Sequence, residues 1–236
     1  MRYTTLLMDV DDTIFDFPAC EYRALQAALT NYGLPFDDTV HDSFSRINAA
    51  LWKKFEINQI TRAELRIRRF TELIEQCFSG YSRAEALANE YVARLGEQAI
   101  YIDGAQEALQ RLCQVYDIYI ITNGLKTVQR GRFQRSGLYA YIKDCFISDE
   151  MSVQKPMKAY FDVVLSHIAE HDTDKILVVG DSLTSDMLGA KNASITSVWF
   201  MPQGDIEGSM KKYEIDYCAS SFDDLFEVLR KWSEKM

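Results

Sequence analysis

The chain carries a short apolar segment, residues 4–8, followed directly by the acidic sequence Asp9-Val10-Asp11-Asp12-Thr13. The apolar segment has the length and composition of a strand buried on both faces of a parallel sheet. Aspartate is a poor strand former and is costly to bury. Because ligands bind at the carboxyl ends of strands in open α/β sheets, Asp9 and Asp11 predict a binding site at this end of the strand. The structural alternative is a solvated acidic turn.

The chain after residue 98 alternates between apolar segments of strand length and segments with helical periodicity. Strands are predicted over residues 116–121, 145–147, 175–179, 196–200 and 217–219. Helices are predicted over residues 103–115, 125–136, 158–168, 184–191 and 222–232. Such alternation is typical of helices packed on both faces of a parallel sheet. The sequence therefore predicts an α/β fold with a doubly wound, mainly parallel sheet.

Residues 16–97 contain no segment that reads as a strand. Apolar residues recur at helical spacing over residues 22–32 and 40–55. Thr61-Arg62-Ala63-Glu64 and Ser82-Arg83-Ala84-Glu85 both match the capping box that opens a helix. This segment is therefore predicted to be a helical bundle inserted after the first strand. The predicted division is an α/β core of residues 1–15 and 98–236 and a helical insertion of residues 16–97.

Polar side chains recur where the predicted strands end. Because the carboxyl ends of parallel strands meet at one edge, we expect these side chains to lie close together. Three carboxylates suit a hard cation such as Mg²⁺. A lysine, a threonine hydroxyl and the N–H groups that open a helix suit a phosphoryl group, and the combination indicates phosphoryl transfer. The residues concerned are Asp9, Asp11, Thr122, Asn123, Lys155, Asp181 and Asp186.

Each of these features also has a purely structural interpretation. Thr122-Asn123-Gly124 could be only a strand-to-helix turn. Lys155 could be a surface lysine before a proline at the first position of a helix. Asp181 and Asp186 could be acidic residues that complement a helix dipole. One shared site explains all of them at once, so it is the interpretation that we favour.

The composition narrows the classes of partner. The net charge of −9 argues against binding of a nucleic-acid polymer, which needs basic patches. No apolar stretch approaches the roughly 18 residues of a membrane span, and no signal-peptide pattern is present, so no membrane association is expected. The five cysteines are scattered without a Cys-x-x-Cys pair, as expected for reduced thiols in a cytoplasmic protein. Arg62, Arg66, Arg68 and Arg69 are expected to form a solvated face with acidic partners.

The order and spacing of these motifs resemble those of the haloacid dehalogenase-like hydrolase superfamily, and the helical insertion resembles the cap that some of its members carry after the first strand. The motifs that carry the resemblance are Asp9–Thr13, Thr122, Lys155 and Gly180–Asp186. Within the superfamily, Ile47–Trp52 and Val153–Pro156 are similar to the bacterial pyrimidine 5′-nucleotidase branch.

The resemblance implies a role for each aspartate. Asp9 is implied to be the nucleophile that forms an aspartyl phosphate, and Asp11 the general acid and base. Mg²⁺ is implied to be held by the Asp9 carboxylate, the Asp11 backbone carbonyl and Asp181, with Asp186 supporting them through water or hydrogen bonds.

The same resemblance implies that Thr122, Asn123 and Lys155 bind the phosphoryl oxygens. Asn48 and Trp52, one helical turn apart, could contact a base or sugar, or Trp52 could pack inside the bundle.

The expected function is Mg²⁺-dependent hydrolysis of small phosphorylated metabolites, with pyrimidine nucleoside 5′-monophosphates favoured. The alternatives are a sugar-phosphate phosphatase or phosphomutase with the same core, and a regulatory protein that has lost catalysis. A carbon–halogen hydrolase is disfavoured because Asp11 is present. The sequence leaves the oligomeric state open.

Overall fold

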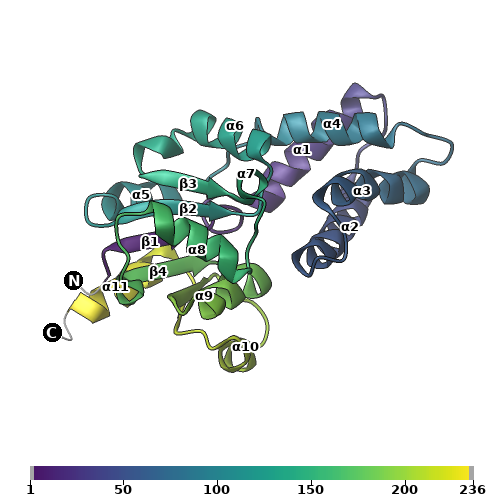
Figure 1. Cartoon of the computed structure of the whole chain (residues 1–236). Coiled ribbons are helices and arrows are strands. Elements are labelled where there is room, and N and C mark those ends of the chain that lie inside the picture. The colour runs from purple at the N-terminus through teal and green to yellow at the C-terminus, as the bar shows by residue number, and fades with distance from the viewer. Residues whose placement is uncertain (1–2, 234–236) are drawn as a thin grey trace.

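The computed structural model describes residues 3–233, in which six strands form one sheet (Figure 1). All neighbouring strands run parallel, in the order β3-β2-β1-β4-β5-β6. The predicted α/β fold with a parallel sheet is therefore confirmed, and each predicted strand is present with ends that differ by no more than one residue. The strands are β1 (Thr5–Met8), β2 (Asp117–Thr122), β3 (Asp144–Ile147), β4 (Ile176–Gly180), β5 (Thr196–Phe200) and β6 (Tyr217–Ala219).

Helices cover both faces of the sheet. Successive side chains of a strand point to opposite faces, so Leu6 and Met8 pack against one set of helices and Leu7 against the other. The first set is α5 (Ala105–Leu112), α6 (Lys126–Ser136) and α11 (Phe222–Ser233). The second is α8 (Lys158–His167), α9 (Leu188–Ala193) and α10 (Ile206–Tyr213). No helix within residues 3–233 is both long enough and apolar enough to cross a membrane.

Four helices between β1 and α5 form a unit beside the sheet, with an apolar core of their own (Figure 1). They are α1 (Phe17–Asn31), α2 (Asp38–Glu56), α3 (Arg62–Cys77) and α4 (Ala84–Leu95). The rings of Phe44, Phe70 and Tyr91 lie at the centre of this core, with centroids 5.1 to 5.5 Å apart. Below, these helices are called the helical unit.

Two linkers, residues 9–16 and residues 96–104, join the helical unit to the sheet. They are held together by hydrogen bonds from Asp16 N to Ile100 O and from Ile102 N to Ile14 O, both 2.9 Å. The boundaries expected from the sequence, at residues 15/16 and 97/98, stay a prediction, and the outer ends of the core at residues 1 and 236 lie outside the described residues.

The two expected capping boxes have different outcomes. Thr61 and Glu64 form one at the start of α3, with each side chain bonded to the backbone N–H of the other. The second is wrong, because Arg83 takes the N-cap position of α4 without a side-chain hydrogen bond. That shift places Glu85 at the second helical position, one short of the position from which a glutamate reaches back to the cap.

The remaining differences lie at helix ends and in two helices that were not predicted, α7 (Ser148–Met151) and α10. Gly104, with φ of +79°, delays the start of α5. The helix expected over residues 184–191 begins as a π-helical turn, Leu183–Met187, before α9. Helix α10 was missed; its N-cap Asp205 accepts a hydrogen bond from Gly208 N at 3.0 Å. The short helix α7 follows β3 directly.

Candidate active site

Three neighbouring strands end in polar residues at the same edge of the sheet. Asp9 follows β1, Thr122 ends β2 and Asp181 follows β4. Strand β1 lies between the other two and pairs in parallel with both. The topology therefore brings together side chains that are far apart in the sequence.

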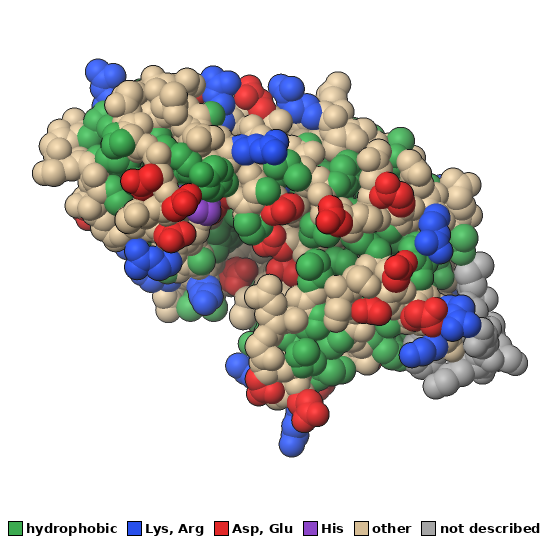
Figure 2. Space-filling model, turned by 180° about the vertical axis from the view of Figure 1, so that it is seen from behind, with side chains coloured by type: hydrophobic (Ala, Val, Ile, Leu, Met, Phe, Trp, Pro, Cys, Tyr) green, Lys and Arg blue, Asp and Glu red, His purple; other side chains and the backbone are tan. Residues whose placement is uncertain are grey.

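A cavity of about 600 Å³ lies between this edge of the sheet and the helices α1 and α2. Acidic side chains are visible in the hollow between the two parts of the molecule (Figure 2). Asp186, which is fully buried beneath the cavity, is the only predicted site residue that does not line it. The others form part of its wall: Asp9, Asp11, Asn48, Trp52, Thr122, Asn123, Lys155 and Asp181.

The ammonium group of Lys155 is buried among three acceptors. Its Nζ donates to Asp9 Oδ1 and to Asp186 Oδ1, both at 2.6 Å, and to the carbonyl of Ile121 at 3.0 Å. Burial by itself lowers the pKa of Lys155, but the carboxylates of Asp186 and Asp9 outweigh it and raise that pKa above its ordinary value. Lys155 is therefore a fixed positive charge at the floor of the cavity.

Three carboxylates gather around this charge. Oxygens of Asp9, Asp181 and Asp186 lie within 4.8 Å of one another. The pKa of Asp9 is raised from 3.8 to about 8, because burial, together with the nearby Asp186 and Asp11, raises it by more than Lys155 lowers it. Burial, with Asp186 and Asp9 beside it, also raises the pKa of Asp181. A divalent cation would relieve this crowding of negative charge, and an all-oxygen donor set suits Mg²⁺.

The turn after β4 places Asp186 under the site. A Cβ atom at position 180 would collide with the Asp186 carboxyl group, so only glycine allows the approach. Asp186 accepts from Lys155 through Oδ1 and from Ser182 N through Oδ2, the latter at 3.1 Å. Both of its oxygens are thus engaged by the protein, which leaves Asp9 and Asp181 as the more available metal ligands.

The loop after β2 is tied to the segment that carries Lys155. The side-chain amide of Asn123 donates to the carbonyl of Lys155 at 2.9 Å and accepts from its N–H at 3.0 Å. The hydroxyl of Thr122 accepts from Gly124 N at 3.0 Å and lies 3.1 Å from Gln129 Nε2. The Asn123 side chain therefore orders the backbone here, while the Thr122 hydroxyl and Lys155 line the cavity.

Asp11 is held by two side chains of α6. Arg132 donates to its Oδ1 and Gln129 to its Oδ2. Asp11 still lines the cavity, and its side chain is 29% exposed.

The wall of the cavity formed by the helical unit is polar. Glu21 is 4% exposed and accepts hydrogen bonds from Asn48 Nδ2 at 2.7 Å and from Ser45 Oγ. The side-chain oxygen of Asn48, Oδ1, accepts in turn a hydrogen bond from Arg69 at 3.3 Å. Trp52 is half-buried, with its ring edge-to-face on a neighbouring phenylalanine, and lines the same cavity.

Sequence reasoning missed Glu21. The available signal was its place on the buried stripe of α1, where the residues one turn further along are Ala24 and Leu25. An acidic residue on an otherwise apolar stripe calls for a buried partner, but only the fold shows that Asn48 and Ser45 supply it.

The expected solvated arginine face is only half correct. Arg68 pairs with Glu72 at an exposed position, and Arg66 bonds an exposed asparagine. Arg69, however, is 3% exposed and lies over the ring of Tyr91 at 4.5 Å. Arg69 is buried because positions 62, 65 and 69 share the face of α3 that packs inward rather than toward solvent.

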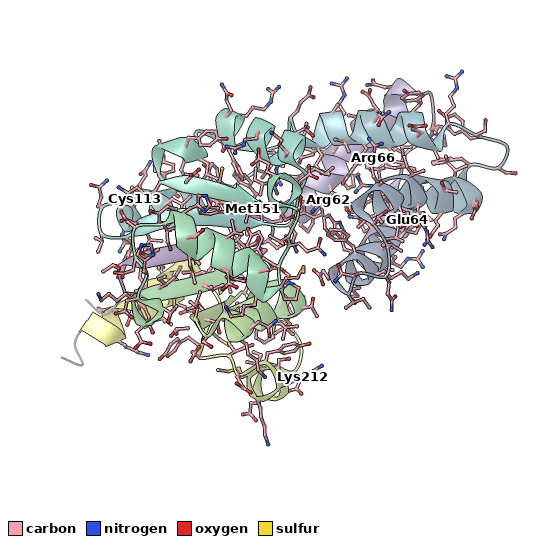
Figure 3. All side chains as sticks on the ribbon, in the orientation of Figure 1. Arg62, Glu64, Arg66, Cys113, Met151 and Lys212 are labelled. Carbon is pink, nitrogen blue, oxygen red and sulfur yellow. The ribbon has the colours of Figure 1, made fainter. Side chains whose placement is uncertain are left out.

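Arg62 extends from the helical unit to the sheet-bearing part, as Figure 3 shows. Its guanidinium donates to the carbonyl of Asn123 at 2.6 Å and to Ser148 Oγ at 2.7 Å. It also lies 3.4 Å from Asp149. Two further hydrogen bonds cross the same boundary, from Gln154 to the carbonyl of residue 55 and from Thr184 to the side chain of residue 56.

The sequence of the chain matches a family model and several known proteins. Residues 6–200 match the family described as haloacid dehalogenase-like hydrolase. The HAD-hydrolase YfnB of Bacillus subtilis is 35% identical over 229 residues, which is 97% of this chain and 96% of that protein. The pyrimidine 5′-nucleotidase PynA of Streptococcus pneumoniae is 34% identical over 232 residues, 98% of this chain and 97% of that one.

A solved structure shows the same arrangement of the whole chain. The crystal structure of B. subtilis YfnB, described as bound to magnesium and as revealing interdomain movement, superimposes with a TM-score of 0.88 at 34% identity. The match covers 98% of this chain and all of that one.

Proposed function

The chain belongs to the haloacid dehalogenase-like hydrolase family, and on this basis we propose that it is a Mg²⁺-dependent phosphatase of nucleoside 5′-monophosphates, with pyrimidine nucleotides preferred. The observation that carries the proposal is the buried contact of Lys155 with Asp9 and Asp186 under a cavity with a polar far wall. That contact supports a site in which Asp9 acts as the nucleophile and Lys155 as a cationic phosphate ligand at the floor of the same cavity.

Asp9 is the nucleophile in this proposal. One of its oxygens attacks phosphorus, the bond from phosphorus to the leaving oxygen breaks, and Asp11 donates a proton to that oxygen. Water then attacks the phosphorus of the aspartyl phosphate and gives a proton to Asp11. The bond from phosphorus to the Asp9 oxygen breaks, which releases phosphate and restores the Asp9 carboxylate. Lys155 and the Thr122 hydroxyl hold the phosphoryl oxygens during both steps.

The metal ligands in this proposal are the carboxylates of Asp9 and Asp181 and the backbone carbonyl of Asp11. Mg²⁺ bound there supplies positive charge that offsets the repulsion between an anionic nucleophile and an anionic ester. Asp186 holds Lys155 and the turn after β4 in place beneath them.

The helical unit, residues 16–97, is the proposed cap that selects the leaving group and excludes water. Glu21 and Asn48 on its wall offer acceptors and a donor to a neutral leaving group with N–H or O–H donors, such as a pyrimidine imide or a sugar hydroxyl. The cavity volume of about 600 Å³ lies in the usual range for a small-molecule site. The name of the relative PynA supports the same substrate class.

A substrate panel tests this proposal. The purified protein is incubated with Mg²⁺ and pyrimidine and purine nucleoside 5′-monophosphates, a hexose 1-phosphate and p-nitrophenyl phosphate. We expect free phosphate, fastest from the pyrimidine nucleotides, and none after chelation of the metal. Isomerisation of the hexose phosphate without phosphate release would show a phosphomutase instead, and no turnover of any ester would overturn the assignment as a phosphatase.

A further inference from the structure

Arg132 carries a buried positive charge that the hydrolytic steps above do not use. Its side chain is 0% exposed, and its guanidinium lies over the ring of Phe15 at 4.8 Å. Nη1 lies 2.5 Å from Asp11 Oδ1 and 3.2 Å from Gln129 Oε1, and Nε donates to the carbonyl of Gln98 at 3.0 Å. Within the described residues, Asp11 is the one carboxylate with which it forms a salt bridge.

Both oxygens of Asp11 are held from one face of α6. While Arg132 takes Oδ1, Gln129 donates to Oδ2 at 2.9 Å. The same Gln129 nitrogen lies 3.1 Å from the Thr122 hydroxyl. A Cβ atom at position 124 would collide with the Gln129 amide, so the glycine there makes room for it. Asp11 therefore has a fixed orientation relative to the proposed phosphate site.

Stability alone is a weak reason to bury this pair. Desolvating a guanidinium and a carboxylate costs about as much as their attraction returns, and an apolar pair of similar volume is often as stable. What the pair does supply is geometry, because a planar guanidinium fixes the direction of a carboxylate. A general acid must point at the leaving oxygen, so a fixed direction of the Asp11 carboxyl group serves the proposed chemistry.

We propose that Arg132 is a positioning residue for Asp11. It acts through that side chain and does not touch the substrate, and the inference rests on the proposed role of Asp11 as the general acid. Arg132 also contacts both linkers, through Phe15 in one and the Gln98 carbonyl in the other. The orientation of the acid is thereby tied to the position of the linkers on which the helical unit is carried.

The role predicts a dependence on the leaving group. An alkoxide leaving group, as in a nucleoside, needs a proton from the acid, whereas p-nitrophenolate leaves without one. General-acid assistance contributes about 10²- to 10⁴-fold, so partial loss of positioning is expected to lower kcat/KM for a nucleotide by about 10- to 100-fold. The kcat/KM for p-nitrophenyl phosphate is expected to fall by less than about threefold, because this constant reports the steps up to departure of the leaving group and not the later attack of water, which is common to both esters.

The experiment compares Arg132→Met and Arg132→Lys with wild type on uridine 5′-monophosphate and p-nitrophenyl phosphate. Arg135→Met, an exposed position on the same helix, is the matched control and should behave as wild type on both. Asp11→Asn shows the full loss of the acid, and Arg132→Lys should recover part of the difference between the substrates. Circular dichroism establishes that each variant is folded.

Gln129→Leu, which frees the other oxygen of Asp11, should show the same selectivity and is the second variant if Arg132→Met does not fold.

Equal losses of kcat/KM on both esters in the folded variants, or no loss on either, would overturn the positioning role. If wild type hydrolyses neither ester, the proposed phosphatase function itself fails. If wild type hydrolyses p-nitrophenyl phosphate but not the nucleotide, only the proposed preference for nucleotides fails. The variants are then compared on a hexose 1-phosphate that wild type does hydrolyse, which replaces uridine 5′-monophosphate as the ester with an alkoxide leaving group.

Discussion

The ammonium nitrogen of Lys155 lies 2.6 Å from Oδ1 of Asp9, although 146 positions separate the two residues in the chain. The same nitrogen is 2.6 Å from Asp186. One buried cation therefore balances two buried carboxylates, and the site depends on it for charge balance as much as for phosphate binding.

Removal of this charge is expected to destabilise the metal-free protein. Above about pH 8, where the buried Asp9 is ionised, Lys155→Met leaves two carboxylates facing each other, and loss of one partner from a buried ion pair typically costs about 3–5 kcal/mol. Urea unfolding in the presence of a chelator measures the free energy of unfolding. Lys158→Met is the control, since Lys158 pairs with Asp162 at an exposed position, and should change stability by less than about 0.5 kcal/mol. Equal effects of the two substitutions would contradict the charge balance.

The raised pKa values predict how stability depends on pH. Because the pKa of Asp9 rises from 3.8 to about 8 on folding, and that of Asp181 also rises, the folded metal-free protein holds protons that the unfolded chain releases. This contribution to stability is complete below about pH 3.8 and is lost as the pH rises to about 8.

Magnesium is expected to compensate for that loss. Mg²⁺ competes with protons for the same carboxylates, so it should raise the melting temperature more at pH 8 than at pH 6. Differential scanning fluorimetry with and without MgCl₂ at the two pH values measures the difference. A rise in melting temperature that is the same at both, or larger at pH 6, would contradict the assignment of these aspartates as ligands.

Glu21 is expected to discriminate against a charged leaving group. Uridine 5′-monophosphate and uridine 3′,5′-bisphosphate differ only in one phosphate, which would bring negative charge toward the buried carboxylate of Glu21. Glu21→Gln keeps the shape but removes the charge, and should raise kcat/KM for the bisphosphate relative to the monophosphate by about tenfold. Glu75→Gln, at an exposed position of α3, should leave the ratio unchanged. An unchanged ratio in Glu21→Gln would show that Glu21 only holds α1 and α2 together.

Arg62 is expected to hold the helical unit against the phosphate-binding loop. Arg62→Ala removes charged hydrogen bonds to Asn123 and Ser148, each worth about 1.5–3 kcal/mol at most, and should lower kcat/KM by at least tenfold. Arg68→Ala on the same helix removes only an exposed pair with Glu72 and should change it less than about twofold. The steady-state rates of both variants on one nucleotide measure this difference. A similarly small loss of kcat/KM in both variants would refute the role of Arg62 in holding the helical unit.

The sheet and the residues at its edge could be predicted from the sequence because the signals are local. Each strand is a compact apolar run, and in a parallel sheet the residue that follows a strand must lie at the common edge. Asp9, Thr122 and Asp181 could be placed together on that reasoning alone. The three residues lie next to one another because their strands are neighbours in the sheet, in the order β2-β1-β4.

The polar residues of helices could not be placed in the same way. Arg132 and Gln129 look like surface residues of a polar helix, and only the packing of α6 against the linkers buries them. The burial of Arg69 was missed for the same reason, since it depends on how Tyr91 of the next helix, α4, packs over the guanidinium group. Burial of a charged side chain is decided by its partner, and a single sequence does not name the partner.

The nucleophilic role of Asp9 is tested most directly by trapping the intermediate. Wild type and Asp9→Asn are mixed with Mg²⁺ and the best substrate of the panel, quenched in acid within the first turnover and digested, and the peptides are measured by mass spectrometry. We expect a phosphoryl group on Asp9 in wild type, and neither that group nor phosphate release in folded Asp9→Asn. Phosphate release by Asp9→Asn at a rate near that of wild type would contradict a covalent mechanism through this residue.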